Sequence, residues 1–151
     1  MTTIDKSIEV LNDLIEINND RVAGFTHATR ELQEKELDVR NLFMELRNQS
    51  RENVHALGRA IHKSGGKVEM AMSGGATLHR VWLDLKCSFT GHSRKSILSE
   101  CERGEDAIKK AYQVALSAGD IFPPEVRELI LQQQQGIVTA HNKIKELRDE
   151  A

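Results

Sequence analysis

Residues that break helices or favour strands are scarce in this sequence. Only two of its 151 residues are proline, and these are adjacent, at Pro123 and Pro124. Aromatic residues make up 4%, and runs of β-branched residues are few. Proline interrupts helices, whereas aromatic and β-branched residues favour strands. The composition therefore favours long helices and argues against a sheet.

Long apolar runs and an excess of one charge are also lacking. No stretch of about 18 apolar residues occurs, and the segment Met1–Leu14 is charged and amphipathic, so we expect no membrane span, no signal peptide and a cytoplasmic protein. Lys and Arg number 21 against 23 Asp and Glu, which gives no general indication of nucleic acid or an anionic membrane as a partner. Cys87 and Cys101 lack zinc-site spacing, and we interpret them as buried, reduced thiols.

Apolar residues recur at three- and four-residue steps in four long segments, which is the spacing of one buried helical face. The expected helices cover about residues 3–35, with Thr3 as N-cap; 38–64, capped by Asp38; from Ser93 to about 117–119; and the stretch after Pro124. The long connection between the second and third carries a shorter helical pattern over Ala76–Phe89, including Trp82. These lengths predict an all-α four-helix bundle with one long crossover, as a single domain over residues 1–151.

Several polar residues fall on the inner faces of these helices. Glu105 lies on the apolar face of the third helix, and Tyr112 follows it by seven residues. A buried carboxylate is costly unless charged or hydrogen-bonding groups surround it. We expect Glu105 to bond Lys109 one turn on, or a side chain from another helix, in a buried network. The network residues are Asn18, Gln49, Asn53, Glu105 and Tyr112, with His141 as a further candidate partner.

A second pattern has the form of a paired metal-ligand motif. Glu52 and His55 on the second helix read as Glu-x-x-His, which di-iron bundles use. At about 100° per residue, however, both side chains point away from the apolar face that Leu57 and Ile61 define. We therefore expect both to lie on the surface.

Five blocks of the sequence together resemble a family of bacterial ferritin-like four-helix-bundle proteins of unknown function. They are LNDLIEINND (11–20), LHRVWLDLK (78–86), ILSECERGEDAIKKAY (97–112), PPEVRELI (123–130) and AHNKIKELRD (140–149). The resemblance implies a ferritin-like fold in a cytoplasmic bacterial protein, some relatives being associated with stress responses. It does not imply an established activity.

Ferritins proper place an inward Glu on the first and third helices and Glu-x-x-His on the second and fourth. Through the resemblance, Glu105 matches the glutamate of the third helix, and Asn18 stands where the first helix would carry its glutamate. The fourth helix keeps His141, but Val138 stands three residues before it in place of Glu. A di-iron centre needs about four carboxylates, because neutral amides bind hard cations poorly.

Two functions follow from this pattern, and a third from the crossover. The first is a non-catalytic bundle that acts through its surfaces and self-associates as a homo-oligomer, with a degenerate metal site. The alternative is a metal-binding protein or oxidase, with iron held by Glu105 and His141. The third is an anion or nucleic-acid partner at the basic residues of the crossover and the loop after it, which are Arg80, Lys86, His92, Arg94 and Lys95. A solvated surface is the commoner role for such a patch.

Overall fold

The structure, a computed structural model, describes residues 2–32, 34, 36–69 and 93–151. These residues form four long helices, and no strand occurs among them. The helices are α1 (Thr3–Glu31), α2 (Leu37–Lys63), α4 (Arg94–Leu116) and α5 (Pro124–Glu150). The predicted all-α four-helix bundle is confirmed. The shorter helix expected over Ala76–Phe89, with Trp82, lies outside the described residues, as does Cys87.

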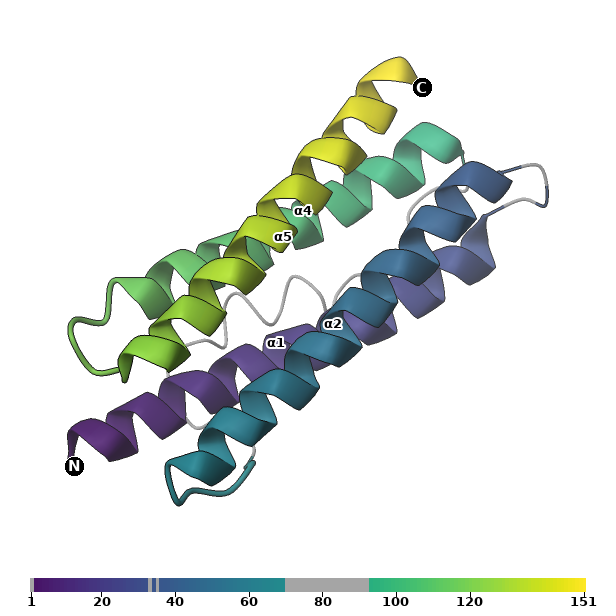
Figure 1. The fold of residues 1–151 in the computed structure, drawn as a ribbon. Coiled ribbons are helices and arrows are strands. Elements are labelled where there is room, and N and C mark those ends of the chain that lie inside the picture. Colours follow the sequence, from purple (N-terminus) through teal and green to yellow (C-terminus); the bar gives the residue numbers. More distant parts are fainter. Residues whose placement is uncertain (1, 33, 35, 70–92) are drawn as a thin grey trace.

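The four helices form two antiparallel hairpins, α1 with α2 and α4 with α5 (Figure 1). The hairpins pack on each other mainly through α1 and α4, whereas α2 and α5 meet at few positions. Arg94 at the start of α4 is ion-paired with Glu36 and Asp38 at the start of α2. The connection from α2 to α4 therefore joins opposite ends of the bundle, as the predicted long crossover requires. None of the described helices combines the length and apolar character that crossing a bilayer takes.

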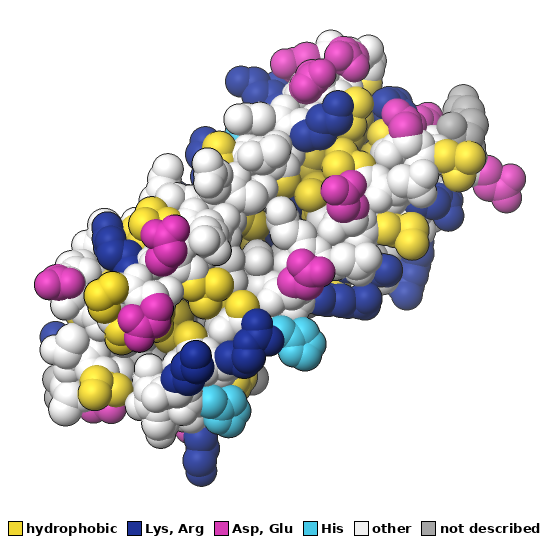
Figure 2. Space-filling view, viewed as in Figure 1, with side chains coloured by type: hydrophobic (Ala, Val, Ile, Leu, Met, Phe, Trp, Pro, Cys, Tyr) yellow, Lys and Arg dark blue, Asp and Glu magenta, His cyan; other side chains and the backbone are white. Residues whose placement is uncertain are grey.

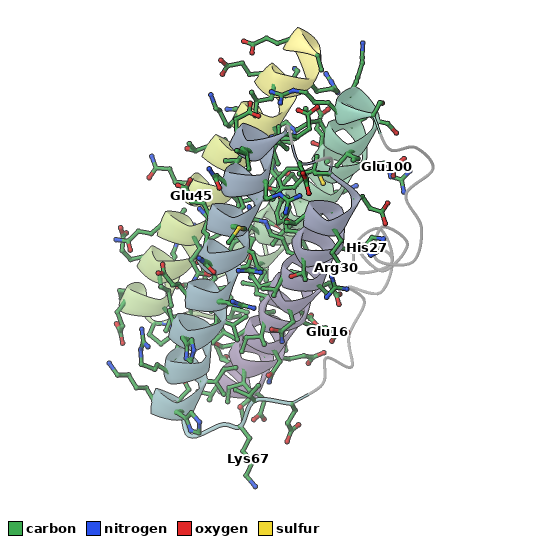
Figure 3. The ribbon with its side chains drawn as sticks, turned by 90° about the vertical axis from the view of Figure 1, so that its right-hand side faces the viewer. Glu16, His27, Arg30, Glu45, Lys67 and Glu100 are labelled. Carbon is green, nitrogen blue, oxygen red and sulfur yellow. The ribbon has the colours of Figure 1, made fainter. Side chains whose placement is uncertain are left out.

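All four helices contribute apolar side chains to one core. Phe25 on α1 and Phe43 on α2 are fully buried, with ring centroids 5.1 Å apart. The three- and four-residue periodicity identifies most of these positions, because one face of each helix turns toward the others. Ile4 is an exception: its position near the start of α1 leaves its side chain 58% exposed. Charged side chains such as Arg30 of α1 and Glu45 of α2 point outward from the helices (Figure 3).

The ends of α1 differ from the predicted ones. Its N-cap is Thr2 rather than Thr3: the Thr2 Oγ1 accepts from the Asp5 N–H, and the Thr2 N–H donates to the Asp5 carboxylate, both at 3.1 Å. These bonds lower the pKa of Asp5. The helix ends at Glu31 and not near residue 35, because Leu32 takes an extended conformation and buries its side chain in the core.

Asp38 is not the cap of α2, as the sequence had suggested. The helix begins at Leu37, and its N-cap, Glu36, makes no side-chain cap bond. Asp38 lies within the first turn, and its two oxygens accept from Arg94 at 2.8 and 2.7 Å. At the start of α4 the predicted cap is confirmed, since the Ser93 Oγ accepts from the Ser96 N–H at 3.1 Å.

The chain that leaves α2 packs along α1. The side-chain amide of Asn12 donates to the Lys67 carbonyl at 3.2 Å and accepts from the Glu69 N–H at 2.8 Å. Gly66 lies directly against Ile8, and a Cβ on Gly66 would stand 2.6 Å from the Ile8 Cδ1. The start of the crossover is thereby fixed to α1.

Candidate functional site

A fully buried arginine lies at the centre of the bundle. Arg21 on α1 donates from Nε and Nη2 to the two carboxylate oxygens of Glu105 on α4, each at 2.7 Å. Its Nη1 donates to the Gln49 Oε1 at 2.7 Å and to the Ser50 Oγ at 2.9 Å, both on α2. The guanidinium also lies 5.3 Å from the ring centroid of Phe25, one turn along α1. One cation therefore ties α1 to both α2 and α4.

A chain of neutral hydrogen bonds continues from this ion pair. The Ser50 Oγ donates to the Asn18 Oδ1 at 2.8 Å, and the Asn18 Nδ2 donates to the Tyr112 hydroxyl at 2.9 Å. Tyr112 donates in turn to the Gln133 Oε1 on α5 at 2.7 Å. Asn53 on α2 donates to the Asn18 Oδ1 at 3.2 Å. The bonds bring all four described helices together. We call these eight residues the central network: Asn18, Arg21, Gln49, Ser50, Asn53, Glu105, Tyr112 and Gln133.

Burial decides the protonation of Tyr112 within this network and of Cys101, which is buried outside it. Burial raises the pKa of Tyr112 well above its ordinary value, and this effect outweighs the Asn18 hydrogen bond and the Arg21 charge, which lower it. Tyr112 is therefore a protonated phenol that donates. Burial also raises the pKa of the Cys101 thiol, and the charges of Glu105 and Glu100 add to this effect. Cys101 is consequently a buried free thiol and not a thiolate nucleophile.

The structure brings the five predicted network residues together, but it changes the partner of Glu105. Both hydrogen bonds that Glu105 makes go to Arg21, which sequence reasoning had missed, and not to Lys109 or to an amide of another helix. Ser50 and Gln133 also join the network. Glu52 and His55 are exposed, as their helical phase predicted.

His141 belongs to a different group from the one expected. The sequence predicts that His141 would bind a metal together with Glu105. The structure instead places His141 beside Glu102 and Asp106, which lie one turn from each other on α4. The His141 Nε2 lies 2.6 Å from an Asp106 oxygen and 3.8 Å from a Glu102 oxygen. We call Glu102, Asp106 and His141 the seam cluster, because it bridges α4 and α5. Its three potential metal-binding atoms lie within 4.8 Å of one another.

A cleft lies where α2 and α5 separate. Its volume is about 430 Å³, and the network residues Gln49, Asn53 and Gln133 line it. A neighbouring groove of about 470 Å³ shares Ala56, Arg59 and Leu129 with it and extends to Ile4 at the start of α1. Hydrophobic side chains are visible along the boundary between the two hairpins, with Lys, Arg and His side chains beside the lower end of that boundary (Figure 2).

The basic residues of the crossover do not form a described surface. Arg80, Lys86 and His92 lie outside the described residues. The Arg94 guanidinium is bound by Glu36 and Asp38, so it is already neutralised.

Comparison with known proteins gives a family but no activity. The chain matches no curated protein sequence. Residues 6–118 match a family described as a domain of unknown function (DUF2383). This stretch covers most of the chain and includes Arg21, Glu105 and Tyr112, but it ends before α5. The chain therefore belongs to the DUF2383 family.

Proposed function

We propose that this protein is a single-domain, ferritin-like bundle of a bacterial cytoplasm, non-catalytic at its centre, that acts by associating with a second copy of itself. The observation that supports the first part most directly is the ion pair of Arg21 and Glu105. The charge that an inward glutamate would offer to a metal ion is already neutralised by a guanidinium from α1. A stress-related role, as in some of the proteins it resembles, is consistent with such a bundle.

Electrostatics argue against a metal ion at this position. Two unit charges 4 Å apart interact by about 4 kcal/mol at an effective dielectric constant of 20, and a divalent ion doubles the repulsion from Arg21. The other polar groups of the centre are the amides of Asn18, Gln49, Asn53 and Gln133 and the hydroxyls of Ser50 and Tyr112, all of which are neutral and cannot neutralise a hard cation. With one carboxylate already paired, the central network lacks the charge that a di-iron centre needs. This is why we prefer a bundle without ferroxidase activity over the iron oxidase.

The groove between α2 and α5 is our candidate surface for self-association. Its walls combine apolar side chains with opposite charges on the two helices: Arg59 and Lys63 on α2, and Glu125 on α5. In a two-fold dimer the same patch meets itself, and with the two-fold axis running along the groove α2 of one copy would face α5 of the other. The basic wall would then meet the acidic one. The described start of the crossover is bonded to α1 at Lys67 and Glu69.

Iron oxidation tests the non-catalytic part of the proposal. Purified protein, stripped of metal, is mixed with Fe²⁺ in air, and formation of Fe³⁺ is followed by absorbance. We expect the rate to equal that of buffer alone, in the wild type and in Glu105→Gln. Oxidation by the wild type that is lost in Glu105→Gln would restore the oxidase mechanism and refute the proposal.

Light scattering after gel filtration tests the dimer. Ile4 lines the groove and is 58% exposed, whereas Val114 on α4 is 57% exposed and lies outside it. We expect a dimer for the wild type and for Val114→Glu, and a monomer for Ile4→Glu. A monomeric wild type, or a dimer that Ile4→Glu leaves intact, would contradict the proposed interface.

A further inference from the structure

We propose that the seam cluster of Glu102, Asp106 and His141 binds one divalent transition-metal ion of the zinc class. The site is separate from the central network. Glu105 directs its carboxylate to α1, whereas Glu102 and Asp106 face His141 on α5. The cluster is therefore a site between α4 and α5 only.

The orientation of the histidine ring is the first argument. The His141 Nδ1 lies 3.2 Å from the Asn142 Oδ1. That oxygen can only accept, so the bond places a proton on Nδ1. Histidines that bind metal commonly donate their second N–H to a carbonyl or carboxylate in this way. Nε2, the nitrogen left to coordinate, is the one turned to the carboxylates.

The short distance across the cluster is the second argument. A neutral Nε2 and a carboxylate oxygen both carry lone pairs, and at 2.6 Å they repel unless a cation lies between them. A proton or a metal ion can fill that role. Zinc bonds of about 2.0–2.2 Å need a somewhat wider gap between Nε2 and Asp106. The Asp106 side chain is 60% exposed, so it can move outward and widen the distance between its oxygen and the His141 Nε2.

Arg148 on α5 supplies the support that a metal-binding carboxylate usually has. Its Nη1 donates to the Glu102 Oε2, while the oxygen nearer His141 is Oε1. Arg148 therefore orients Glu102 without occupying the oxygen that faces the histidine, whereas Arg21 occupies both oxygens of Glu105. Hydrogen bonds like that of Arg148 to metal ligands are a regular feature of metal sites. Glu102 and Asp106 carry two negative charges against the one positive charge of Arg148, so the cluster keeps a net negative charge that favours a cation.

The chemistry of the three groups selects the class of ion. One imidazole nitrogen with two carboxylate oxygens suits zinc and its first-row neighbours, whereas calcium prefers six or more oxygen ligands. His141 and Glu102 are buried, and the Asp106 side chain faces solvent. A bound ion would thus have protein on one side and water in its remaining positions.

Calorimetric titration of metal-stripped full-length protein with Zn²⁺ tests the site. We expect one Zn²⁺ per chain in the wild type, and binding at least about tenfold weaker in Asp106→Asn and in His141→Ala. His55→Ala is the matched control, because His55 is an exposed histidine on α2. It should bind Zn²⁺ as the wild type does, and so should Glu105→Gln.

Several results would overturn the site. The wild type could bind no Zn²⁺, in which case the short contact with Asp106 is held by a proton alone. Zn²⁺ binding that survives unchanged in Asp106→Asn and His141→Ala would place the ion elsewhere. Asp106→Asn keeps the test decisive even if His141→Ala fails to fold, since Asp106 is a surface side chain. Loss of binding in Glu105→Gln alone would move the ion to the centre and refute the proposed function as well.

Discussion

Arg21 and Glu105 are 84 positions apart in the sequence and meet in a two-bond ion pair from which water is excluded. Both side chains are fully buried, and the guanidinium binds α2 as well. Taking two charges out of water is expensive, and only excellent geometry with further hydrogen bonds offsets the cost. We therefore interpret the pair as a contact that specifies how α1, α2 and α4 are arranged.

Breaking this pair from one side should be severe. Glu105→Leu leaves the Arg21 guanidinium buried without a counter-charge, so we expect a loss of about 3–5 kcal/mol in the free energy of unfolding. Glu105→Gln keeps one side-chain oxygen that can accept a hydrogen bond from Arg21, so its loss in the free energy of unfolding should be smaller. Urea denaturation followed by circular dichroism measures both.

The double variant Arg21→Met with Glu105→Leu is the control for that prediction. It removes both charges, so its cost should be well below the sum of the two single variants. If the losses in the free energy of unfolding are additive, the two side chains are not energetically coupled. That result would contradict the interpretation of Arg21 and Glu105 as one buried ion pair.

Sequence periodicity identified the inward faces of the helices but not Arg21, the side chain that neutralises Glu105. Arginine is rarely fully buried, so pattern reasoning assigns it to the surface. A signal did exist: Asn18, Arg21 and Phe25 are spaced by three and four residues and share one face of α1. A buried glutamate on a neighbouring helix then calls for a cation, and Arg21 was the candidate on that face.

Tyr112→Phe should weaken the network without removing its charges. The hydroxyl receives a hydrogen bond from Asn18 and donates one to Gln133, so its loss leaves a buried Gln133 oxygen without that donor. We expect a loss of about 1–3 kcal/mol in the free energy of unfolding. A change within about 0.5 kcal/mol, as at a surface position, would contradict this role.

The same residue gives a prediction on alkaline pH. The unfolded chain releases the phenolic proton near the ordinary pKa of 10, whereas burial raises the pKa of Tyr112 in the folded state. Above that pH the folded state holds more protons than the unfolded state, so stability falls as pH rises. Tyr112 is the only tyrosine in the chain, so tyrosinate absorbance reports it alone. We expect that absorbance to appear only as the protein unfolds, and Tyr112→Phe to lose this part of the alkaline dependence.

Asp38 should contribute to stability with the opposite pH dependence. Hydrogen bonds from Arg94 lower the pKa of Asp38 from 3.8 to about 2. A lowered pKa stabilises the folded state above the ordinary value, and this contribution is lost as pH falls toward 2. The Asp38 side chain is 60% exposed, so solvent screening limits the effect of Asp38→Asn at neutral pH to about 1 kcal/mol or less. The difference in the free energy of unfolding between the wild type and Asp38→Asn, measured by urea denaturation, should disappear on acidification. A difference that persists below pH 2 would refute this contribution of Asp38.

Helix ends and the seam cluster were harder to predict than helix faces, for different reasons. The end of α1 is set by Leu32, whose burial draws the chain out of the helix, and such a tertiary contact has no local signature. His141 was recognised as a candidate, but its partners depend on how α5 is rotated against α4. Glu102 and Glu105 are three positions apart on α4, so a modest rotation of α4 against α5 decides which of them His141 faces. Periodicity places residues on a face and does not fix that angle.

Two glycines near the start of the crossover should respond in opposite ways to alanine. At Gly66 a Cβ would stand 2.6 Å from the Ile8 Cδ1 and 3.1 Å from two further Ile8 carbons, so either the Ile8 side chain or the chain at Gly66 must shift. We expect Gly66→Ala to lower the free energy of unfolding by about 1–3 kcal/mol, as overpacking does. At Gly58, within α2, the nearest atom is a Val68 carbon at an ordinary 3.7 Å. Gly58→Ala should therefore stabilise the protein by about 0.5–1 kcal/mol through helix propensity.

Ile8 provides the control for this pair. Truncating it in Ile8→Ala removes the atoms that a Cβ on Gly66 would meet. Gly66→Ala should then cost much less in the Ile8→Ala background than in the wild type, whereas the effect of Gly58→Ala should be the same in both. If Gly66→Ala costs the same in both backgrounds, the penalty comes from the backbone of the turn. The contact of Gly66 with Ile8 would then not help to hold the start of the crossover on α1, and the Asn12 hydrogen bonds would remain as its attachment.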